Sequence, residues 1–140
     1  KIARDLDPEL PLVNLDPEQM KRALINLVDN ALDVLDGEGE IAIRTRFLKE
    51  THVVALEVVD SGPGIPRADR ERLFLPYFST KPGGTGLGLA IVHRIVAEHA
   101  GQIRIEDNVP RGTRVIIELP ALSSSVDNDD GVGPWPTNTS

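Results

Sequence analysis

The chain has 140 residues, 40% of them hydrophobic, which is enough for one compact domain with its own core. Its formal net charge of -7 argues against nucleic acid or an anionic membrane as a direct partner. The absence of cysteine excludes disulfides, cysteine-ligated zinc and a thiol nucleophile, and no apolar run of about 18 residues could span a membrane. These features fit a cytoplasmic domain.

The first predicted element is a helix that begins at Asp16. Asp is a favoured N-cap, Pro17 suits the first helical position, and Gln19 is placed to complete a capping box. The apolar residues that follow recur at i, i+3, i+4 and i+7, which predicts one core-facing stripe ended by Gly37. The stripe consists of Met20, Ala23, Leu24, Leu27, Val28, Ala31, Leu32 and Leu35.

The middle of the chain alternates between strand and helix patterns. Segments rich in β-branched residues predict strands, and the apolar pattern after the glycine-rich stretch predicts a second helix closed by Gly101. We therefore expect an α+β fold in two layers, with a sheet packed against helices. The predicted strands are residues 40–47, 53–60, 102–107 and 113–120, and the predicted helix is residues 85–100.

The end of the chain has a different composition. Residues 122–140 are rich in Ser, Asp, Gly and Pro, with too few apolar side chains to offset the entropy of ordering. We predict a flexible tail or linker there and a single domain at residues 1–121. Since the sequence begins with Lys1, we expect it to be a piece of a longer protein.

Polar residues follow one edge of the first predicted helix. Asn26 and Asn30 are four residues apart, so they lie on successive turns, and Asp33 continues the same edge. Asn is disfavoured inside a helix because its amide competes for backbone hydrogen bonds. Alone, this pattern is typical of a solvated helix edge, and its weight depends on the rest of the chain.

Two glycine-containing segments supply that context. In "DSGPGIP", Asp60 ends a strand, and Gly62 and Gly64 leave room for a ligand to approach the backbone. In "LFLPYFSTKPGGTGLGLAI" (residues 73–91), a polar glycine-rich segment with Lys81 as its one cation precedes a helix N-terminus, which is a favourable seat for phosphate oxygens. The segment is neither a Walker loop nor a dinucleotide-binding fingerprint.

In order and spacing, these segments resemble the ATP-binding catalytic domain of sensor histidine kinases, within the family shared with gyrase, Hsp90 and MutL. "NLVDNALDVL" resembles the N box, "DSGPGIP" the first glycine box, "LFLPYFSTK" the F box and "GTGLGL" the second glycine box. The phrase "PYFSTKPGGTGLGLAIV" is most similar to kinases of the nitrogen-regulatory type. The resemblance implies a Bergerat-type fold with a mixed sheet and a mobile ATP lid at about residues 66–85.

The resemblance also implies roles for individual residues. Asn30 matches the asparagine that binds Mg²⁺, and Asn26 would help position the phosphates or the metal. Asp60 matches the aspartate that accepts a hydrogen bond from the adenine amino group. Lys81 is the candidate lid cation for the γ-phosphate. The remaining implied ATP-binding residues are Gly62, Gly64, Ile65, Gly84, Thr85, Gly86, Leu87 and Gly88.

The sequence departs from the family pattern in two ways. Asp33 stands where many sensor kinases have a lysine, three residues after the N-box asparagine. Lys81 is therefore the preferred candidate for the basic contact with the phosphates. None of His52, His93 and His99 lies in a phosphoacceptor motif. We therefore expect the acceptor histidine on a separate helical domain of the parent protein, an indirect link to a response regulator, and a largely monomeric fragment.

Three alternative functions remain. A gyrase- or Hsp90-type ATPase is disfavoured because the position of its catalytic glutamate holds Asn26, and an amide is not a useful proton acceptor. A serine kinase of the anti-sigma type is disfavoured by the segments "FST" and "GTGLGL" of the expected lid. A catalytically silent interaction module is disfavoured by the intact Asn30, Asp60 and glycines.

Overall fold

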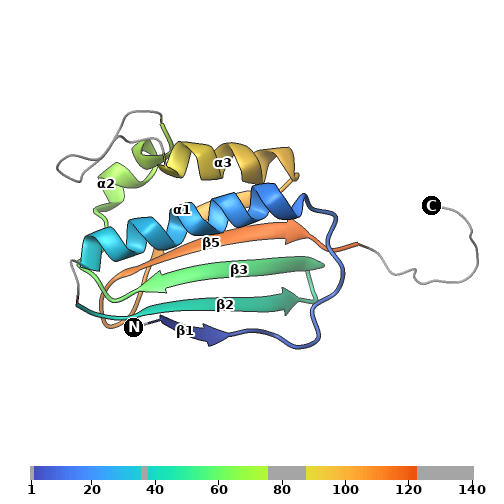
Figure 1. The fold of residues 1–140 in the computed structure, drawn as a ribbon, viewed down its shortest axis with the longest axis horizontal. Coiled ribbons are helices and arrows are strands. Elements are labelled where there is room, and N and C mark those ends of the chain that lie inside the picture. Colours follow the sequence, from blue (N-terminus) through green and yellow to red (C-terminus); the bar gives the residue numbers. More distant parts are fainter. Residues whose placement is uncertain (1, 36–37, 76–87, 123–140) are drawn as a thin grey trace, which may run out of the picture.

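The structure, a computed structural model, describes residues 2–35, 38–75 and 88–122. Within them the chain forms one sheet with helices along one of its faces (Figure 1). The strands are β1 (Ile2–Asp5), β2 (Ile41–Leu48), β3 (Val53–Asp60), β4 (Gln102–Asp107) and β5 (Thr113–Pro120), and the helical elements are α1 (Pro17–Leu35), α2 (Arg67–Arg70), the 3-10 helix η1 (Arg72–Phe74) and α3 (Gly88–Glu98).

The sheet is mixed, and its strand order is β1-β2-β3-β5-β4. β1 pairs with β2 in parallel, whereas β2 with β3, β3 with β5 and β4 with β5 are antiparallel. β3 therefore lies at the centre, and its last residue, Asp60, pairs with Ile41 on one side and Thr113 on the other. This pairing fixes the point at which the chain leaves the sheet for the glycine-containing loop.

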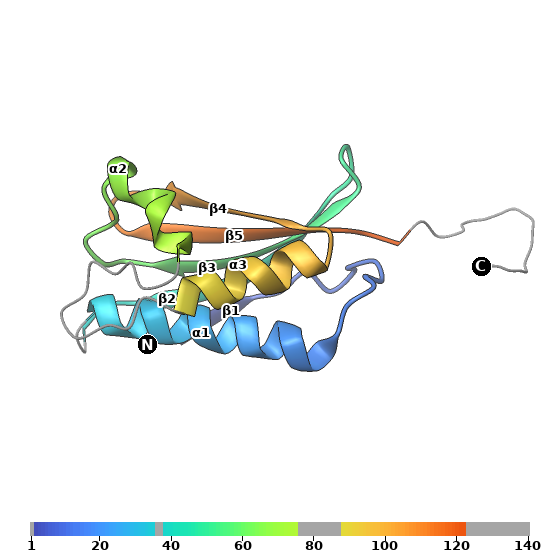
Figure 2. The same cartoon turned by 90° about the horizontal axis from the view of Figure 1, so that it is seen from above.

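The two long helices lie side by side over the sheet (Figure 2). Asp16 caps α1 as predicted, because its Oδ1 accepts the backbone N–H groups of Glu18 at 3.0 Å and Gln19 at 3.3 Å. His99, just after α3, accepts the N–H of Asp16 at its Nε2, which ties the end of α3 to the start of α1. The buried core between the layers includes Met20, Ala23, Leu27, Ala31, Ile41, Val58, Val92, Ile95, Val96, Ile117 and Leu119.

The predicted α+β fold with a mixed sheet against helices is confirmed, and several details differ. Strand β1 was not predicted, because all of its residues are exposed and it carries no alternating pattern. Leu32, expected in the core stripe, is 46% exposed, so it lies at the solvent-exposed edge of that stripe. The start of the expected lid is helical, because residues 67–74 form α2 and η1.

The C-terminal end of α3 closes with an alanine in the left-handed conformation. Ala100 has φ 59°, and the N–H groups of Ala100 and Gly101 donate to the carbonyls of Ala97 and Val96 at 3.1 and 2.9 Å. This is the Schellman arrangement, in which the left-handed position is usually glycine because a Cβ is strained there. The predicted glycine stop, Gly101, lies one residue after the strained position.

We expect Ala100→Gly to raise the free energy of unfolding by about 0.5–1 kcal/mol, because the strain is relieved at an exposed position. The matched control is Ala97→Gly, the same change at an exposed position inside the last turn of α3. That variant should lose about 1 kcal/mol through helix propensity. Urea unfolding of both variants provides the measurement. If the free energy of unfolding changed in the same direction in both variants, Ala100 would not be the strained position.

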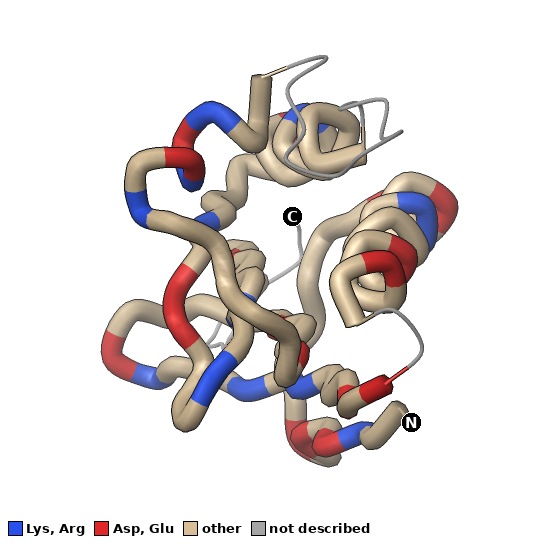
Figure 3. Tube along the Cα trace, turned by 90° about the vertical axis from the view of Figure 1, so that its left-hand side faces the viewer, with Lys and Arg blue, Asp and Glu red and all other residues tan. Residues whose placement is uncertain are grey.

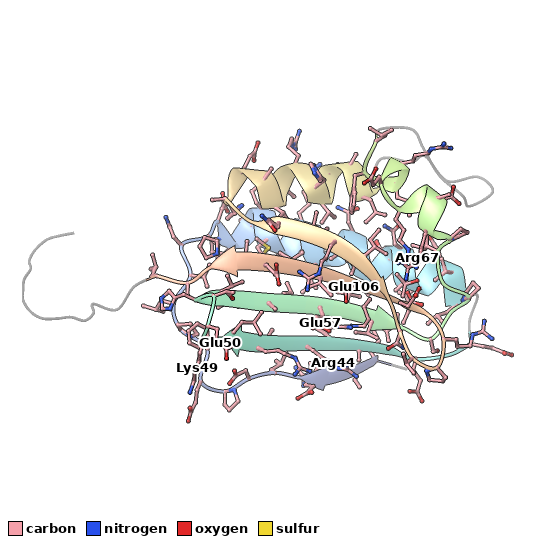
Figure 4. The ribbon with its side chains drawn as sticks, turned by 180° about the vertical axis from the view of Figure 1, so that it is seen from behind. Arg44, Lys49, Glu50, Glu57, Arg67 and Glu106 are labelled. Atoms are coloured by element: carbon pink, nitrogen blue, oxygen red, sulfur yellow. The ribbon has the colours of Figure 1, made fainter. Side chains whose placement is uncertain are left out.

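The sheet face away from the helices carries a network of charged side chains (Figure 4). Glu57, on central strand β3, has a side chain only 6% exposed, and it pairs with Arg114 at 3.3 Å and Arg46 at 4.0 Å. Arg114 also reaches Glu106 at 3.4 Å. Because Glu57 is buried between two arginines, its charge is compensated by both neighbouring strands.

We expect Glu57→Gln to lower the free energy of unfolding by about 1–2 kcal/mol, because two partly exposed arginines lose their shared buried carboxylate. The control Glu106→Gln removes a carboxylate that is 41% exposed and should cost about 0.5 kcal/mol or less. Chemical denaturation at low and high salt measures both. Equal costs would show that burial does not strengthen the Glu57 pairs.

No helix among the described residues combines the length and apolar character needed to cross a membrane.

Candidate functional site

One ridge of α1 faces the first turn of α3. A Cβ placed on Gly88, the first residue of α3, would lie 3.5 Å from Asn30 Nδ2, 3.6 Å from Asn30 Oδ1 and 3.7 Å from Asn26 Oδ1. Asn26 donates its Nδ2 to the carbonyl of Arg22 at 3.0 Å, which turns its oxygen toward Gly88. Both predicted asparagines therefore lie beside the helix N-terminus that the sequence identified as a phosphate seat.

The same ridge continues toward Asp60. Val34 follows Asn30 by one helical turn, and a Cβ placed on Gly62 would lie 3.3 Å from Val34 Cγ2 and 3.1 Å from Asp60 Oδ1. Asn26, Asn30 and Val34 thus mark a line of about 12 Å along α1. Gly88 lies beside the asparagine end of this line, and Gly62 with the Asp60 carboxylate lies beside the Val34 end. The structure therefore brings Asn26, Asn30, Gly88, Gly62 and Asp60 to one side of α1.

Asp60 is a buried carboxylate, 7% exposed. Its Oδ1 accepts the N–H of Gly62 at 2.8 Å. Burial raises the pKa of the Asp60 carboxyl above its ordinary value of 3.8, while hydrogen bonds from the backbone of Gly62 and Thr113 act in the opposite direction and only partly offset it. The environment thus holds the carboxylate in a defined orientation at a cost in desolvation.

This pKa shift predicts a pH dependence of stability. The folded state binds the Asp60 proton more tightly than the unfolded state, so the free energy of unfolding should fall as pH rises from the ordinary value of 3.8 through the raised folded value. Unfolding of the wild type and of Asp60→Asn from about pH 3 to about pH 7 provides the measurement. The difference between the two curves should decline over that window, and a flat difference would contradict the shift.

The two glycines of the loop differ in what they require. Gly64 has φ +86°, and a Cβ there would meet only the carbonyl of Gly112 at 3.5 Å, so its backbone conformation is the constraint. Gly62 has no such φ but is buried against Asp60 and α1, so close packing is the constraint. Ile65, half-buried, follows them, and its carbonyl accepts hydrogen bonds from Arg70.

The predicted site residues Lys81, Gly84, Thr85, Gly86 and Leu87 lie outside the described residues, as does the second half of the expected lid, residues 76–85. The described part of the F box is η1, where Leu73 is buried and the Phe74 ring lies 5.3 Å from the His93 ring of α3. The start of the predicted lid is thereby attached to the same helix that carries Gly88.

The structure also adds residues that the sequence patterns did not indicate. Asn108 donates to the carbonyl of Asp60 at 3.1 Å, and Arg111 donates through Nε to the carbonyl of Gly62 at 3.0 Å. Both residues lie in the turn between β4 and β5, nearly 50 positions further along the chain. The predicted strands 102–107 and 113–120 imply a turn there, but no local pattern indicates which distant carbonyls its side chains reach.

The charges around these loops are mixed in sign. Figure 3 faces the end of the molecule where the loops meet, and it shows acidic and basic residues interspersed along the trace. Arg70 pairs with Asp107, and Arg67 lies 3.9 Å from the same carboxylate. Within the described residues no group of three or more His, Cys, Asp or Glu side chains is placed to hold a metal ion.

Comparison with known proteins gives a consistent set of relatives. The model of the family described as "Histidine kinase-, DNA gyrase B-, and HSP90-like ATPase" matches residues 15–123. The sensory histidine kinase/phosphatase NtrB of Salmonella typhimurium strain LT2 is 41% identical over 129 residues, covering 86% of this chain and 37% of NtrB. The chain thus spans little more than a third of the length of this curated relative.

Solved structures agree in fold. The catalytic domain of histidine kinase ThkA is 38% identical with a TM-score of 0.76, over 86% of this chain and 78% of that one. ThkA in complex with the response regulator protein TrrA matches with a TM-score of 0.72 at 34% identity, over 86% and 34% of the two chains. Full-length ShkA in complex with AMPPNP is 27% identical with a TM-score of 0.77, over 89% and 26%.

Proposed function

Because this chain belongs to the histidine kinase-, DNA gyrase B- and HSP90-like ATPase family, as an ATP-binding catalytic domain of the sensor histidine kinase type, we propose that it binds Mg-ATP and transfers the γ-phosphoryl group to a histidine. The similarity to NtrB supports the nitrogen-regulatory subgroup. The acceptor histidine would lie on a separate helical domain of the parent protein. A response regulator would then receive the phosphoryl group from that histidine.

The observation that carries this proposal is that the predicted phosphate-binding and base-binding residues lie on the same side of α1. The two asparagines face the N-terminus of α3, and one turn further the ridge reaches Gly62 and Asp60. A nucleotide lying along this ridge would place its phosphates beside Asn26, Asn30 and the first N–H groups of α3, where the helix dipole favours negative charge. Its base would lie at the Asp60 end.

The donor set fits magnesium. A Cβ placed on Gly88 would lie 3.6 Å from Asn30 Oδ1 and 3.7 Å from Asn26 Oδ1, so both amide oxygens lie at the proposed phosphate end. Mg²⁺ needs few protein ligands, because it keeps waters and takes phosphate oxygens, and when bound it neutralises charge on the phosphates. We propose Asn30 as the metal ligand, with Asn26 supporting the phosphates or the metal.

The remaining roles follow from the family. Asp60 would accept a hydrogen bond from the adenine amino group, and Gly62, Gly64 and Ile65 would lie against the base. Lys81 would contact the γ-phosphate, and Gly84, Thr85, Gly86, Leu87 and Gly88 would form the hinge and phosphate contacts of a mobile lid. Residues 1–121 would form the catalytic domain and residues 122–140 a tail. We propose that the catalytic domain lies in the cytoplasm, also where the parent protein is anchored in a membrane.

In the proposed transfer, the bond between the γ-phosphorus and the β–γ bridging oxygen breaks, a phosphorus–nitrogen bond forms on the acceptor imidazole, and ADP leaves. The chain's own residues would position the reactants and compensate charge, which supplies most of the catalysis in phosphoryl transfer. Hydrolysis would need a proton acceptor near the phosphates. Asn26 would occupy that place, and an amide, whose nitrogen here donates a hydrogen bond to the carbonyl of Arg22, is not a useful proton acceptor.

Calorimetric titration with Mg-ATP tests the binding step. The wild type should bind, Asn30→Ala should bind at least about tenfold more weakly in the presence of magnesium, and the two should converge when EDTA removes the metal. Asn14→Ala, the same change at an exposed position before α1, is the matched control. Equal binding by Asn30→Ala and wild type would remove Asn30 from the metal.

A transfer assay tests the reaction. The wild type, incubated with γ-labelled ATP and the helical acceptor domain that carries the histidine of an NtrB-type kinase, should yield acid-labile label on that domain. Rapid release of inorganic phosphate without label on the acceptor would favour the ATPase alternative. Binding of ATP without either product would favour the interaction module.

A further inference from the structure

Three backbone carbonyls of the loop at residues 60–65 are held by side chains from elsewhere in the chain. Asn108 Nδ2 donates to the carbonyl of Asp60 at 3.1 Å, and Arg111 Nε donates to the carbonyl of Gly62 at 3.0 Å. Arg70 donates through Nε and Nη2 to the carbonyl of Ile65 at 3.1 and 3.0 Å. The beginning, middle and end of the loop are each fixed.

The sheet itself does not supply this support. The pairing of β3 with β2 and β5 ends at Asp60, and Ser61 makes the last contact of this edge by donating its N–H to the carbonyl of Glu40 at 3.1 Å. Residues 62–65 therefore have no strand partner. Within the described residues, Arg111 provides the side-chain donor to the carbonyl of Gly62, so its removal would take away the middle attachment of the loop.

The turn between β4 and β5 is itself braced. Asn108 Nδ2 also donates to the carbonyl of Arg111 at 3.1 Å, and the N–H of Asn108 donates to the carbonyl of Gly112 at 3.0 Å. Arg70 pairs with Asp107, the residue just before the turn. Asn108 thus contacts both the turn and the Asp60 loop with the same amide group, so the two segments are held in one register.

We infer that Asn108 and Arg111 are positioning residues for purine recognition, acting through Asp60 and Gly62 rather than by touching the nucleotide. This inference rests on the proposed function. The Asp60 carboxylate accepts the N–H of Gly62 at 2.8 Å, so a shift of the Gly62 peptide moves the partner that orients the carboxylate. Asn108 fixes the backbone of Asp60 itself, and Arg111 fixes the peptide that follows Gly62.

The test compares ATP with purine riboside triphosphate, which lacks only the exocyclic amino group that Asp60 would read. For each variant, calorimetry gives the dissociation constant of purine riboside triphosphate divided by that of ATP. A high ratio means a preference for ATP. The wild type should prefer ATP by about tenfold or more, since a hydrogen bond to a charged group is involved. Asn108→Ala and Arg111→Ala should each lower this ratio by about threefold or more. Partial unfolding raises both constants by the same factor, so the ratio is insensitive to it.

The matched control is Arg104→Ala, an arginine of the same hairpin that pairs with Glu106 and Glu118. Its ratio should equal that of the wild type. Arg111→Lys keeps the charge but moves the donor to the end of a flexible chain, so its ratio should stay low.

Four outcomes decide the matter. A lowered ratio in both alanine variants with an unchanged control supports the inference. Equal weakening of both ligands shows a merely structural role and overturns it, and full recovery in Arg111→Lys overturns it in favour of charge. A wild type that binds ATP without preferring it removes Asp60 from base reading, which is a failure of the proposed function rather than of the positioning contacts alone.

Discussion

Gly112→Ala should destabilise the fold by about 3–5 kcal/mol, the largest loss that we expect from a glycine-to-alanine change among the glycines that the structure describes. A Cβ on Gly112 would lie 1.8 Å from the carbonyl oxygen of Asp60, 2.7 Å from its carbonyl carbon and 2.9 Å from Ser61 Cα. All three atoms belong to the backbone, so no side-chain rotation relieves the clash. The φ of +112° adds conformational strain.

The Gly112 substitution has a matched control in Gly64→Ala. Gly64 also has a positive φ, but a Cβ there would meet only the carbonyl of Gly112 at an ordinary contact distance of 3.5 Å. It should therefore cost about 1–2 kcal/mol, from backbone strain alone. Thermal and urea unfolding of both variants give the comparison. Similar losses at the two positions would show that β5 moves away from Asp60 without penalty.

Asp60→Asn should weaken Mg-ATP binding by about 10- to 100-fold while leaving the protein folded. The N–H of Gly62 donates to Oδ1, which would fix the amide oxygen of the new asparagine at that position. The amide nitrogen would then occupy the place of the second carboxylate oxygen. The amide nitrogen would point its hydrogens at the adenine amino group and at the backbone N–H of Thr113. At both contacts a donor would then face a donor.

Asp29→Asn is the matched control for this substitution, because Asp29 is an exposed carboxylate on α1. Calorimetric titration with Mg-ATP should give the wild-type dissociation constant for this control. Unchanged binding by Asp60→Asn would exclude Asp60 from base recognition. Loss of binding accompanied by loss of the folded baseline in circular dichroism would instead assign the effect to stability.

The elements that could be predicted from the sequence are those with a repeated burial pattern. The stripe from Met20 to Leu35 indicated α1, and the runs of β-branched residues indicated β2, β3, β4 and β5, each within a residue or two of its bounds. β1 was missed, because its four exposed residues gain stability only from pairing with β2. The short helices α2 and η1 were missed, since a single turn has no periodicity to detect.

The candidate site divides in the same way. Helical spacing placed Asn26 and Asn30 on one ridge, and the strand end placed Asp60, so local rules were sufficient for them. Asn108 and Arg111 act across 48 and 49 positions through backbone carbonyls, which have no residue identity to recognise. Such contacts become visible only when strand pairing brings β5 beside β3. The roles of the individual site residues stay predictions.

The position of Asp60 at the end of the central strand bears on the thermodynamics of ligand binding. β3 has paired strands on both sides along its whole length, so its amides should be among the slowest to exchange with deuterium. A carboxylate mounted there is already ordered before any ligand arrives. Little conformational entropy would then be lost at the base end, and preorganisation would give adenine a favourable share of the affinity even when the rest of the nucleotide is absent.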